Sequence, residues 1–313
     1  MRQCVESPAT ARAVTPPLAG GMLIFSTFIW GTMWWPVQWF CRHGLTGPYM
    51  SLVAYGFVTI VGLPVLWCQR HAWISHAGTL LLIGICGGWT NASFINAMTS
   101  DKIVRAMLLF YLAPLWSVLG AWIFLGEKPG LPRWAALLLA LIGVFVLLGG
   151  ARIIAGDTSM HISSLGRAEW LALSSGIAFA GMNLATRYAQ HTPLASKTFV
   201  VFIATAVVSA MTVAAHPASL ISISMPMVLM LACFGLVWML LGSATTQFGV
   251  SHLPGGTAAM LLLNELVVGV VSAWLIGGQH LTGYEWSGAV LILLAGLLDA
   301  LASFRTVRQL SSA

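Results

Sequence analysis

A carboxyl group and a carboxamide interrupt the most apolar part of the chain. Residues 258–278 are otherwise almost uniformly hydrophobic, yet Asn264 and Glu265 lie near the middle of this stretch. A charged side chain at the centre of a bilayer is unfavourable by a few kcal/mol, about 2.5–3.5 kcal/mol for Asp and the basic residues. We therefore expect Glu265 to face the interior of a helical bundle, where it binds a proton or a cationic substrate.

Helical spacing supports this orientation and leaves one alternative open. Five residues follow one another at steps of three and four, namely Ala258, Leu262, Glu265, Gly269 and Ser272. Three of the five are small, and small residues let neighbouring helices approach closely. The alternative is that Glu265 only joins helices, either permanently protonated or paired with Asn264 or a tryptophan N–H.

Two other segments carry polar or aromatic side chains at helical spacing. Trp30, Trp34 and Gln38 share one face at steps of four and form a candidate aromatic wall for an apolar or cationic solute. Tryptophans near the membrane interface are otherwise anchors. Asn91 lies one turn from Gly88 and is a candidate substrate ligand, although the glycine by itself indicates close helix packing.

The composition indicates a membrane protein. Of its 313 residues, 58% are hydrophobic and 7% are charged, whereas soluble domains carry about 25% charged residues. A helix crosses a bilayer with about 20 apolar residues. We predict ten such helices, over residues 21–41, 48–68, 77–98, 104–125, 131–150, 168–189, 194–215, 225–248, 255–276 and 284–304.

Two stretches of the chain resemble each other. The tetrapeptide AMLL begins at residues 106 and 259, which are 153 residues apart. Trp122 with Trp274, and Trp134 with Trp286, are each 152 residues apart. The chain is therefore predicted to contain two homologous halves of five helices each.

The register of the repeat pairs two polar positions. Tyr111 corresponds to Asn264, so the two halves bring polar groups to an equivalent depth. The one-residue slip falls near Pro114, which is expected to kink its helix because proline lacks a backbone donor. Tyr111 is therefore a candidate to line the same site as Asn264 and Glu265.

An odd number of helices in each half predicts that the second half is inverted in the membrane. Inverted repeats are typical of secondary transporters, which bind solute near the midplane between the halves and expose it alternately to each side. With the N-terminus inside, nine Lys and Arg residues fall on the cytoplasmic side and five on the other. The prediction is therefore an all-α integral membrane protein with both termini cytoplasmic.

The predicted organisation has five parts. They are a cytoplasmic N-terminal tail (1–20), a first five-helix repeat (21–150), a connecting loop (151–167), a second five-helix repeat (168–304) and a cytoplasmic tail (305–313).

Charged residues near the helix ends have local interpretations. Asp101 and Arg105 are four residues apart and are expected to pair with each other. Asp299 is expected to reach the interface or to pair with Arg305. Neither is predicted to bind substrate.

The chain resembles the EamA-type carriers of the drug/metabolite transporter superfamily over both halves. Trp30-Gly31 is similar to the Trp-Gly of the family's first helix, and Gly126-Glu127 to its glycine-glutamate turn. The segment LLNELVVGVVSAWLIGG is similar to a second-half helix that often carries Glu followed by Pro. Two departures are Leu266 at the place of that proline and Gln279 at the place of a second turn glutamate.

The resemblance implies a ten-helix carrier of the inner or plasma membrane that exports small organic solutes such as amino acids, metabolites or cationic and aromatic drug-like compounds. Trp30, Trp34, Gln38, Asn91, Tyr111, Asn264 and Glu265 are the candidate substrate-binding residues. Glu265 is also the candidate for proton coupling. A uniporter or exchanger that uses Glu265 only to hold a cationic solute is the alternative within transport.

Several other classes of protein are disfavoured. The sequence has no phosphate-binding loop, no dinucleotide-binding glycine pattern and no His-Glu-x-x-His pair, so we expect no enzyme activity, no cofactor and no metal site. Its net charge of +6 comes from scattered residues, which argues against binding nucleic acid. A lipid flippase or a membrane-embedded enzyme stays the alternative outside solute transport, and the sequence leaves open a monomer or a homodimer.

Overall fold

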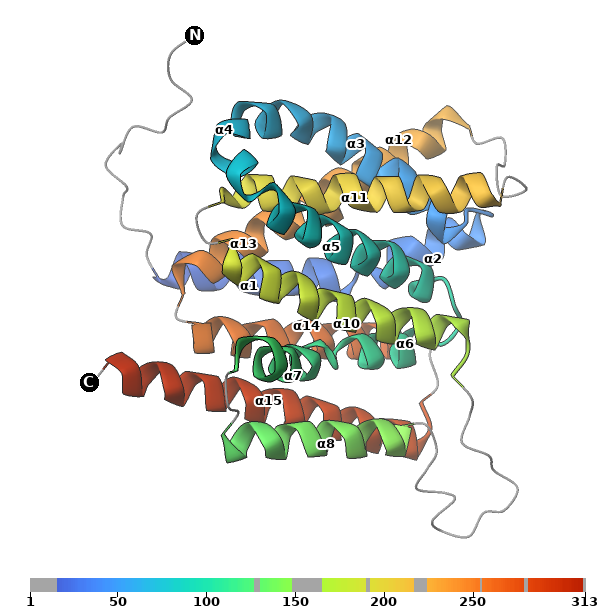
Figure 1. Ribbon diagram of the computed structural model, residues 1–313. Helices are drawn as coiled ribbons and strands as arrows, with labels where there is room; N and C mark the ends of the chain where they lie inside the picture. Colours follow the sequence, from blue (N-terminus) through green and yellow to red (C-terminus); the bar gives the residue numbers. More distant parts are fainter. Residues whose placement is uncertain are drawn as a thin grey trace.

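Helices make up all the regular structure in the part of the chain that the computed structural model describes (Figure 1). The described residues are 16–126, 130–147, 165–189, 192–216, 224–253, 255–278 and 281–311. Residues 1–15 of the predicted N-terminal tail, residues 151–164 of the connecting loop, Glu127 and Gln279 lie outside them.

The first half begins with a helix in two pieces and ends with a helical hairpin. Its helices are α1 (Pro16–Gly31), α2 (Trp34–Arg42), α3 (Gly47–Cys68), α4 (Arg70–Trp73), the 3-10 turn η1 (Ile74–His76), α5 (Ala77–Met98), α6 (Ile103–Phe110), α7 (Ala113–Leu125) and α8 (Leu131–Leu147). Within the described residues, the second half consists of α10 (Arg167–Tyr188), α11 (Leu194–Ala215), α12 (Met225–Phe234), the π-helical turn η3 (Gly235–Leu241), α13 (Gly242–His252), α14 (Gly255–Leu275) and α15 (Gly283–Ser311).

Two predicted helices are interrupted, each within the four residues that precede a proline. The chain leaves helical geometry at Thr32 and Met33 ahead of Pro36, and at Tyr111 and Leu112 ahead of Pro114. A proline ring removes the bond to the carbonyl four residues earlier and collides with it. The predicted kink near Pro114 is confirmed, whereas the break in the first helix was not anticipated.

Among the described residues, seven segments are long and apolar enough to cross a membrane. They are Pro17–Arg42, Gly47–Cys68, Arg70–Met98, Ile103–Phe124, Leu194–Ala215, Met225–Val250 and Gly283–Leu301. Two shorter apolar helices, Leu131–Leu147 and Leu261–Leu275, fall within two further predicted spans. The remaining predicted span, 168–189, coincides with α10, which has Glu169 in its first turn and is not among the seven. The count of ten spans stays a prediction.

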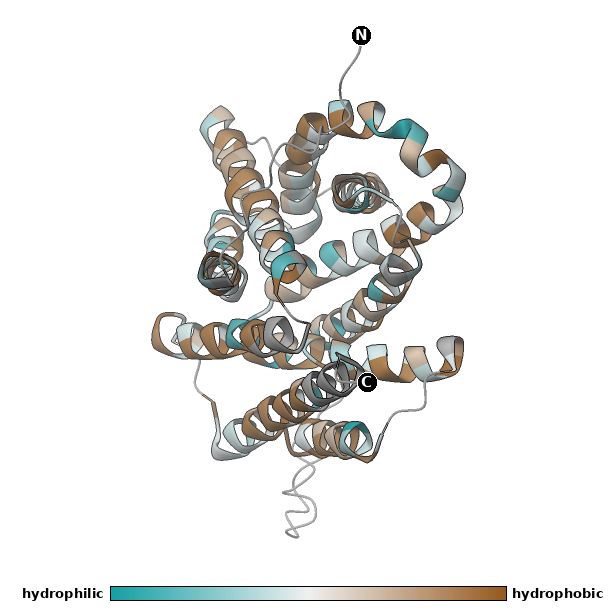
Figure 2. Ribbon diagram, turned by 90° about the vertical axis from the view of Figure 1, so that its left-hand side faces the viewer, coloured by the Kyte–Doolittle hydropathy of each residue, from teal (hydrophilic) through white to brown (hydrophobic). Residues whose placement is uncertain are grey.

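Apolar residues predominate along the helices, with fewer hydrophilic residues among them (Figure 2). Many of the apolar side chains are exposed, among them Ile60, Phe124, Met211 and Ile276. A soluble protein would not leave so many large apolar side chains in water, whereas a lipid-facing surface requires them. The chain is therefore a multi-pass membrane protein.

The helices form a bundle with α8 and α15 side by side along one edge (Figure 1). On the other side of the bundle, α11 packs between α3 and α5. Glycines allow the closest approaches: a Cβ on Gly143 of α8 would lie 3.1 Å from the carbonyl oxygen of Gly288 on α15. Helix α1 begins and α15 ends on the same side of the molecule (Figure 1).

The central helices pack in a reciprocal pattern. Helix α1 of the first half packs against α13 and α14 of the second half. Helix α10 of the second half packs against α5, α6 and α7 of the first half. The tryptophans at equivalent positions of the two repeats also make matching contacts. Trp122 and Trp134 stack edge to face with ring centroids 5.5 Å apart, and Trp274 and Trp286 do so at 5.7 Å.

Candidate functional site

The candidate site lies where the break between α6 and α7 meets the middle of α14. Tyr111, in that break, forms a side-chain hydrogen bond with Glu265 of α14. The phenol hydroxyl can donate this bond to the carboxylate. Because α6 belongs to the first half and α14 to the second, the bond joins the two halves of the chain.

The break between α1 and α2 lies against the same part of α14. A Cβ on Gly31 would lie 2.8 Å from the carbonyl oxygen of Glu265 and 2.8 Å from the Cβ of Val268. Only glycine fits at this contact without displacing the backbone of α14. Gly269, one turn further on, is covered by Met107 of α6, so small residues of α14 face both interrupted helices, as the helical spacing predicts.

Trp30 and Trp34 both donate hydrogen bonds from their indoles to the second half. Trp30 Nε1 lies 3.1 Å from Thr246 Oγ1 on α13, and Trp34 Nε1 lies 2.8 Å from Ser272 Oγ on α14. Trp34 is only 3% exposed. In this conformation it packs between α2 and α14 rather than lining an open surface, so its predicted contact with solute requires a rearrangement.

Gln38 and Asn91 use their amides to join helices. Gln38 Nε2 donates to the carbonyl oxygen of Met98, the last residue of α5, at 2.6 Å, and to that of Ser100, just after it, at 3.0 Å. Asn91 Nδ2 lies 3.3 Å from Thr205 Oγ1 on α11. Within the described residues these amides bond neighbouring helices rather than Glu265. The roles of Gln38 and Asn91 in binding stay predictions.

Asn264 is exposed, although Glu265 beside it is only partly so. Adjacent residues of a helix point about 100° apart, because one turn takes about 3.6 residues. The sequence predicts both side chains in one site, whereas only Glu265 bonds Tyr111. Asn264 lies on a stripe with Val267, Val271 and Trp274, which are all exposed.

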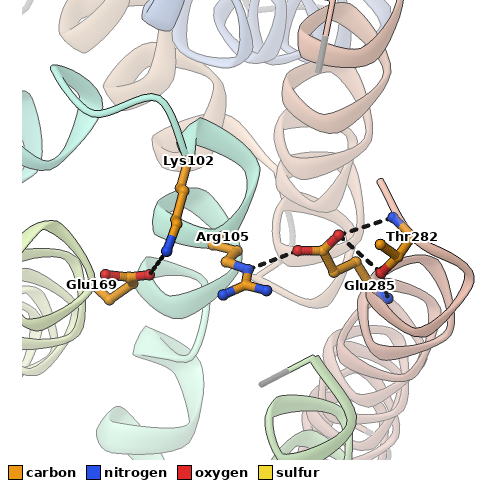
Figure 3. Close-up of polar contacts among 5 residues, drawn as sticks. All are labelled: Lys102, Arg105, Glu169, Thr282 and Glu285. Carbon is orange, nitrogen blue, oxygen red and sulfur yellow. Dashed lines mark hydrogen bonds and ion pairs between the residues drawn. The ribbon is translucent and has the colours of Figure 1, made fainter. Parts of the chain in front are cut away.

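An ion pair replaces the predicted contact between Asp101 and Arg105. Arg105 Nε lies 2.7 Å from Glu285 Oε1 at the start of α15 (Figure 3). The prediction that Asp101 is the partner was wrong, because spacing within one helix cannot reveal a partner 180 residues away. Both side chains are largely buried, with exposures of 20% and 13%.

A second ion pair lies beside the first. Lys102 Nζ is 3.6 Å from Glu169 Oε1 in the first turn of α10 (Figure 3). Glu169 Oε2 also accepts a bond from the backbone N–H of Gly166, 2.8 Å away, and so caps α10. Both ion pairs therefore anchor α6 to the first turn of a helix from the second half.

A third ion pair borders a small cavity between α7, α8 and α15. Arg133 Nε lies 3.8 Å from Asp299 Oδ1. The expected partner, Arg305, has a side chain outside the described residues. The cavity, of about 30 Å³, is also lined by Tyr111 and Pro114. It has room for about one or two water molecules.

Sequence reasoning missed the hydroxyl partners of the site. Thr246 and Thr205 were not singled out, and Ser272 was noted only as a small residue. A threonine or serine in an apolar helix is a weak signal, because its hydroxyl usually bonds a carbonyl of the preceding turn. Thr246 indeed also bonds the carbonyl of Gly242. No cluster of His, Cys, Asp and Glu suited to a metal occurs within the described ranges.

The comparisons with known proteins identify the class. The chain is 24% identical over 267 residues to the riboflavin transporter of Rhizobium johnstonii (strain DSM 114642 / LMG 32736 / 3841), covering 82% of this chain and 81% of that protein. A solved crystal structure shares the fold with a TM-score of 0.59 and 18% identity, over 93% of this chain and 98% of the other. The relative named as a transporter and the multi-pass fold indicate a small-molecule transporter rather than an enzyme.

A family match covers most of the first half of the chain. Residues 18–149 match the EamA-like transporter family. This match confirms the relationship to the EamA-type carriers that the sequence motifs predict.

Proposed function

We propose that this transporter carries a small aromatic or cationic organic solute by alternating access, with Glu265 and Tyr111 at the centre of the binding site. The observation that carries the proposal is the hydrogen bond between these residues, which closes a contact between an interrupted helix and α14. Interrupted helices form the solute sites of many secondary transporters, because their free backbone groups can bind polar parts of the cargo.

Two groups of helices meet at this bond. The Tyr111 group consists of α5, α6, α7 and α10, and the Glu265 group consists of α1, α13 and α14. Each group combines helices from both halves, and the packing within one mirrors the packing within the other. This reciprocity and the matched tryptophan pairs support two inverted repeats. Alternating access then consists of the two groups tilting about the site between them.

Residue chemistry supports an aromatic or cationic cargo. A carboxylate attracts a cation, and Trp30 offers an aromatic face near the break between α1 and α2. The Rhizobium relative is named for riboflavin, a planar aromatic compound. We propose flavin-like heteroaromatic compounds as the first cargo class to test, followed by aromatic amino acids and cationic drugs.

Transport is proposed to run outward across the inner or plasma membrane and to be coupled to protons through Glu265. A carboxyl group that loses its proton when solute binds, and regains it after release, exchanges one for the other. One charge moved across about 100 mV is worth about 2.3 kcal/mol, enough to bias transport by about fifty-fold.

Proteoliposomes test the proposal directly. Purified protein is expected to move riboflavin or another cargo of this class, and an internal pH dye is expected to report counter-movement of protons. Glu265→Gln should abolish the pH dependence of flux. Tyr111→Phe should raise apparent affinity by about tenfold or more, because cargo then reaches Glu265 without first breaking a hydrogen bond to a charged group, which is worth about 1.5–3 kcal/mol. Tyr188→Phe is the matched control, since Tyr188 is 66% exposed.

The outcomes separate the alternatives. Solute flux with no proton movement and no effect of pH would leave a uniporter or exchanger in which Glu265 only holds a cation. Movement of labelled phospholipid without any soluble solute would replace the proposal with a lipid flippase. Unchanged flux in Glu265→Gln would remove Glu265 from the mechanism.

A further inference from the structure

One ion pair connects the Tyr111 group to the opposite side of the site. Arg105, on α6, donates to Glu285 at the start of α15 (Figure 3). Helix α15 packs against α14 of the Glu265 group and follows it in the chain. The pair therefore crosses the boundary along which the two groups are proposed to separate.

Glu285 is held in position for this contact. Its second oxygen, Oε2, accepts bonds from the backbone N–H and the hydroxyl of Thr282, at 2.9 and 3.0 Å. This is the capping-box arrangement, in which a residue at the third helical position bonds the residue that precedes the helix. One carboxylate oxygen thus caps α15 while the other binds Arg105.

The neighbouring ion pair does not cross the boundary. Lys102 immediately precedes α6 as its N-cap and Glu169 lies on α10, and these two helices belong to the same group and pack together. Lys102 is also 59% exposed, so water screens its charge. This pair holds α6 within its own group and serves as an internal control.

The repeat register gives the opposite end of the molecule no equivalent of the crossing pair. The 153-residue spacing relates Arg105 to Ala258, and the 152-residue spacing relates Glu285 to Arg133. An alanine and an arginine cannot form an ion pair. Arg133 lies instead near Asp299, between α8 and α15, which already pack along each other.

We infer that Arg105 and Glu285 form a one-sided latch that keeps the end of the transporter bearing the first turns of α6, α10 and α15 closed at rest. The inference rests on the alternating access proposed above. The resting protein then opens toward the end where α1 begins and α15 ends, the cytoplasmic end in the predicted orientation. An exporter of this design loads cargo before the latch opens.

Helix α6 links the latch to the candidate site. It has eight residues, and Arg105 precedes Tyr111 by six positions, or about 9 Å along a helix. Both ends of this short helix are therefore bonded across the group boundary, to Glu285 and to Glu265. Cargo that displaces Tyr111 from Glu265 frees one end of α6, while the latch still holds its other end.

Distance measurements between spin labels test the latch in the full-length protein. Labels on cysteines at Trp170 of α10 and Ser287 of α15, both exposed, report the separation of the latched end in nanodiscs. The five native cysteines are first replaced by serine. Arg105→Gln and Glu285→Gln are each expected to raise the ratio of the open population, with long distances, to the closed population, with short distances. The expected increase is about 10- to 150-fold, the range that corresponds to a hydrogen bond to a charged group.

The substitutions are chosen to isolate the charge. Glutamine at position 285 still fits the capping box, so the start of α15 is retained. The double variant should open no further than either single variant, because both remove the same contact. Lys102→Gln and Glu169→Gln should change the ratio by less than about fivefold, because the pair lies within one group and its exposed lysine limits its contribution to about 1 kcal/mol.

Each result decides the matter. A merely structural ion pair would lower thermal stability in Arg105→Gln without a new population of longer distances, and this outcome would overturn the latch. Equal effects of Lys102→Gln and Arg105→Gln would also overturn it. Flux of the unmodified protein is measured in parallel, since loss of transport there refutes the proposed function, whereas normal flux with no opening in the variants refutes the latch alone.

Discussion

The contact between Gly31 and α14 makes a prediction whose sign can be worked out from the structure. An alanine Cβ at position 31 would lie 2.8 Å from the carbonyl oxygen of Glu265, which is closer than atoms of these types pack. The obstacle is a main-chain atom, so no side-chain rotation relieves it. Overpacking of this kind is unfavourable by about 1–3 kcal/mol.

Gly21, on the same helix, is the matched control. A Cβ on Gly21 would meet no atom within 4 Å. Gly21→Ala should therefore be stabilising by about 0.5–1 kcal/mol, because alanine loses less backbone entropy than glycine in a helix. The two variants make the same chemical change in α1 and are expected to have opposite effects.

Equilibrium unfolding in mixed detergent and SDS measures both free energies, and flux in proteoliposomes measures the consequence at the site. Gly31→Ala should lower the free energy of unfolding and reduce transport, since α14 must move away from α1 at Glu265. Gly21→Ala should leave transport unchanged. Gly31→Ala with unchanged or increased stability would refute the packing described for α1 and α14.

Three further predictions use the same unfolding assay. Trp34→Phe and Ser272→Ala should each lower the free energy of unfolding by about 0.5–1.5 kcal/mol, and their effects should not be additive, because both remove the same hydrogen bond. The control Trp35→Phe, at a residue 55% exposed, should change the free energy of unfolding by less than about 0.5 kcal/mol. Equal effects at Trp34 and Trp35 would contradict the contact. Gly126→Ala should lower the free energy of unfolding by about 1–2 kcal/mol, because Gly126 has a φ of 68°. Gly130→Ala should leave the free energy of unfolding unchanged. An unchanged value in Gly126→Ala would show that the turn is not left-handed. A double-mutant cycle on Lys102 and Glu169 should give a coupling below about 1 kcal/mol that falls with added salt, and a larger, salt-independent value would mean that the pair is buried.

The sequence predicts faces of helices better than it predicts their partners. The spacing of Glu265, Gly269 and Ser272 places these residues on one side of α14, and the structure turns that side toward α1, α2 and α6. Periodicity describes rotation within a single helix. It does not set how that helix is rotated against its neighbours, which is why Tyr111 bonds Glu265 rather than its repeat equivalent, Asn264.

Breaks and long-range ion pairs show the same limit. Pro114 predicts an interruption because the effect of a proline on the preceding turn is local. Pro36 has the same effect, but the spacing of the tryptophans around it predicts one continuous helix with an aromatic face. The bond between Arg105 and Glu285 depends on the packing of helices far apart in the chain, and no local rule contains that information.

The two edge-to-face tryptophan pairs have a consequence for biogenesis. Each pair joins consecutive helices, α7 with α8 and α14 with α15. The contact can therefore form as soon as both helices of a hairpin have left the translocation machinery, without waiting for the rest of the chain. Each hairpin would enter the final assembly as a preformed unit, because its tryptophan contact already holds the last two helices of that half together.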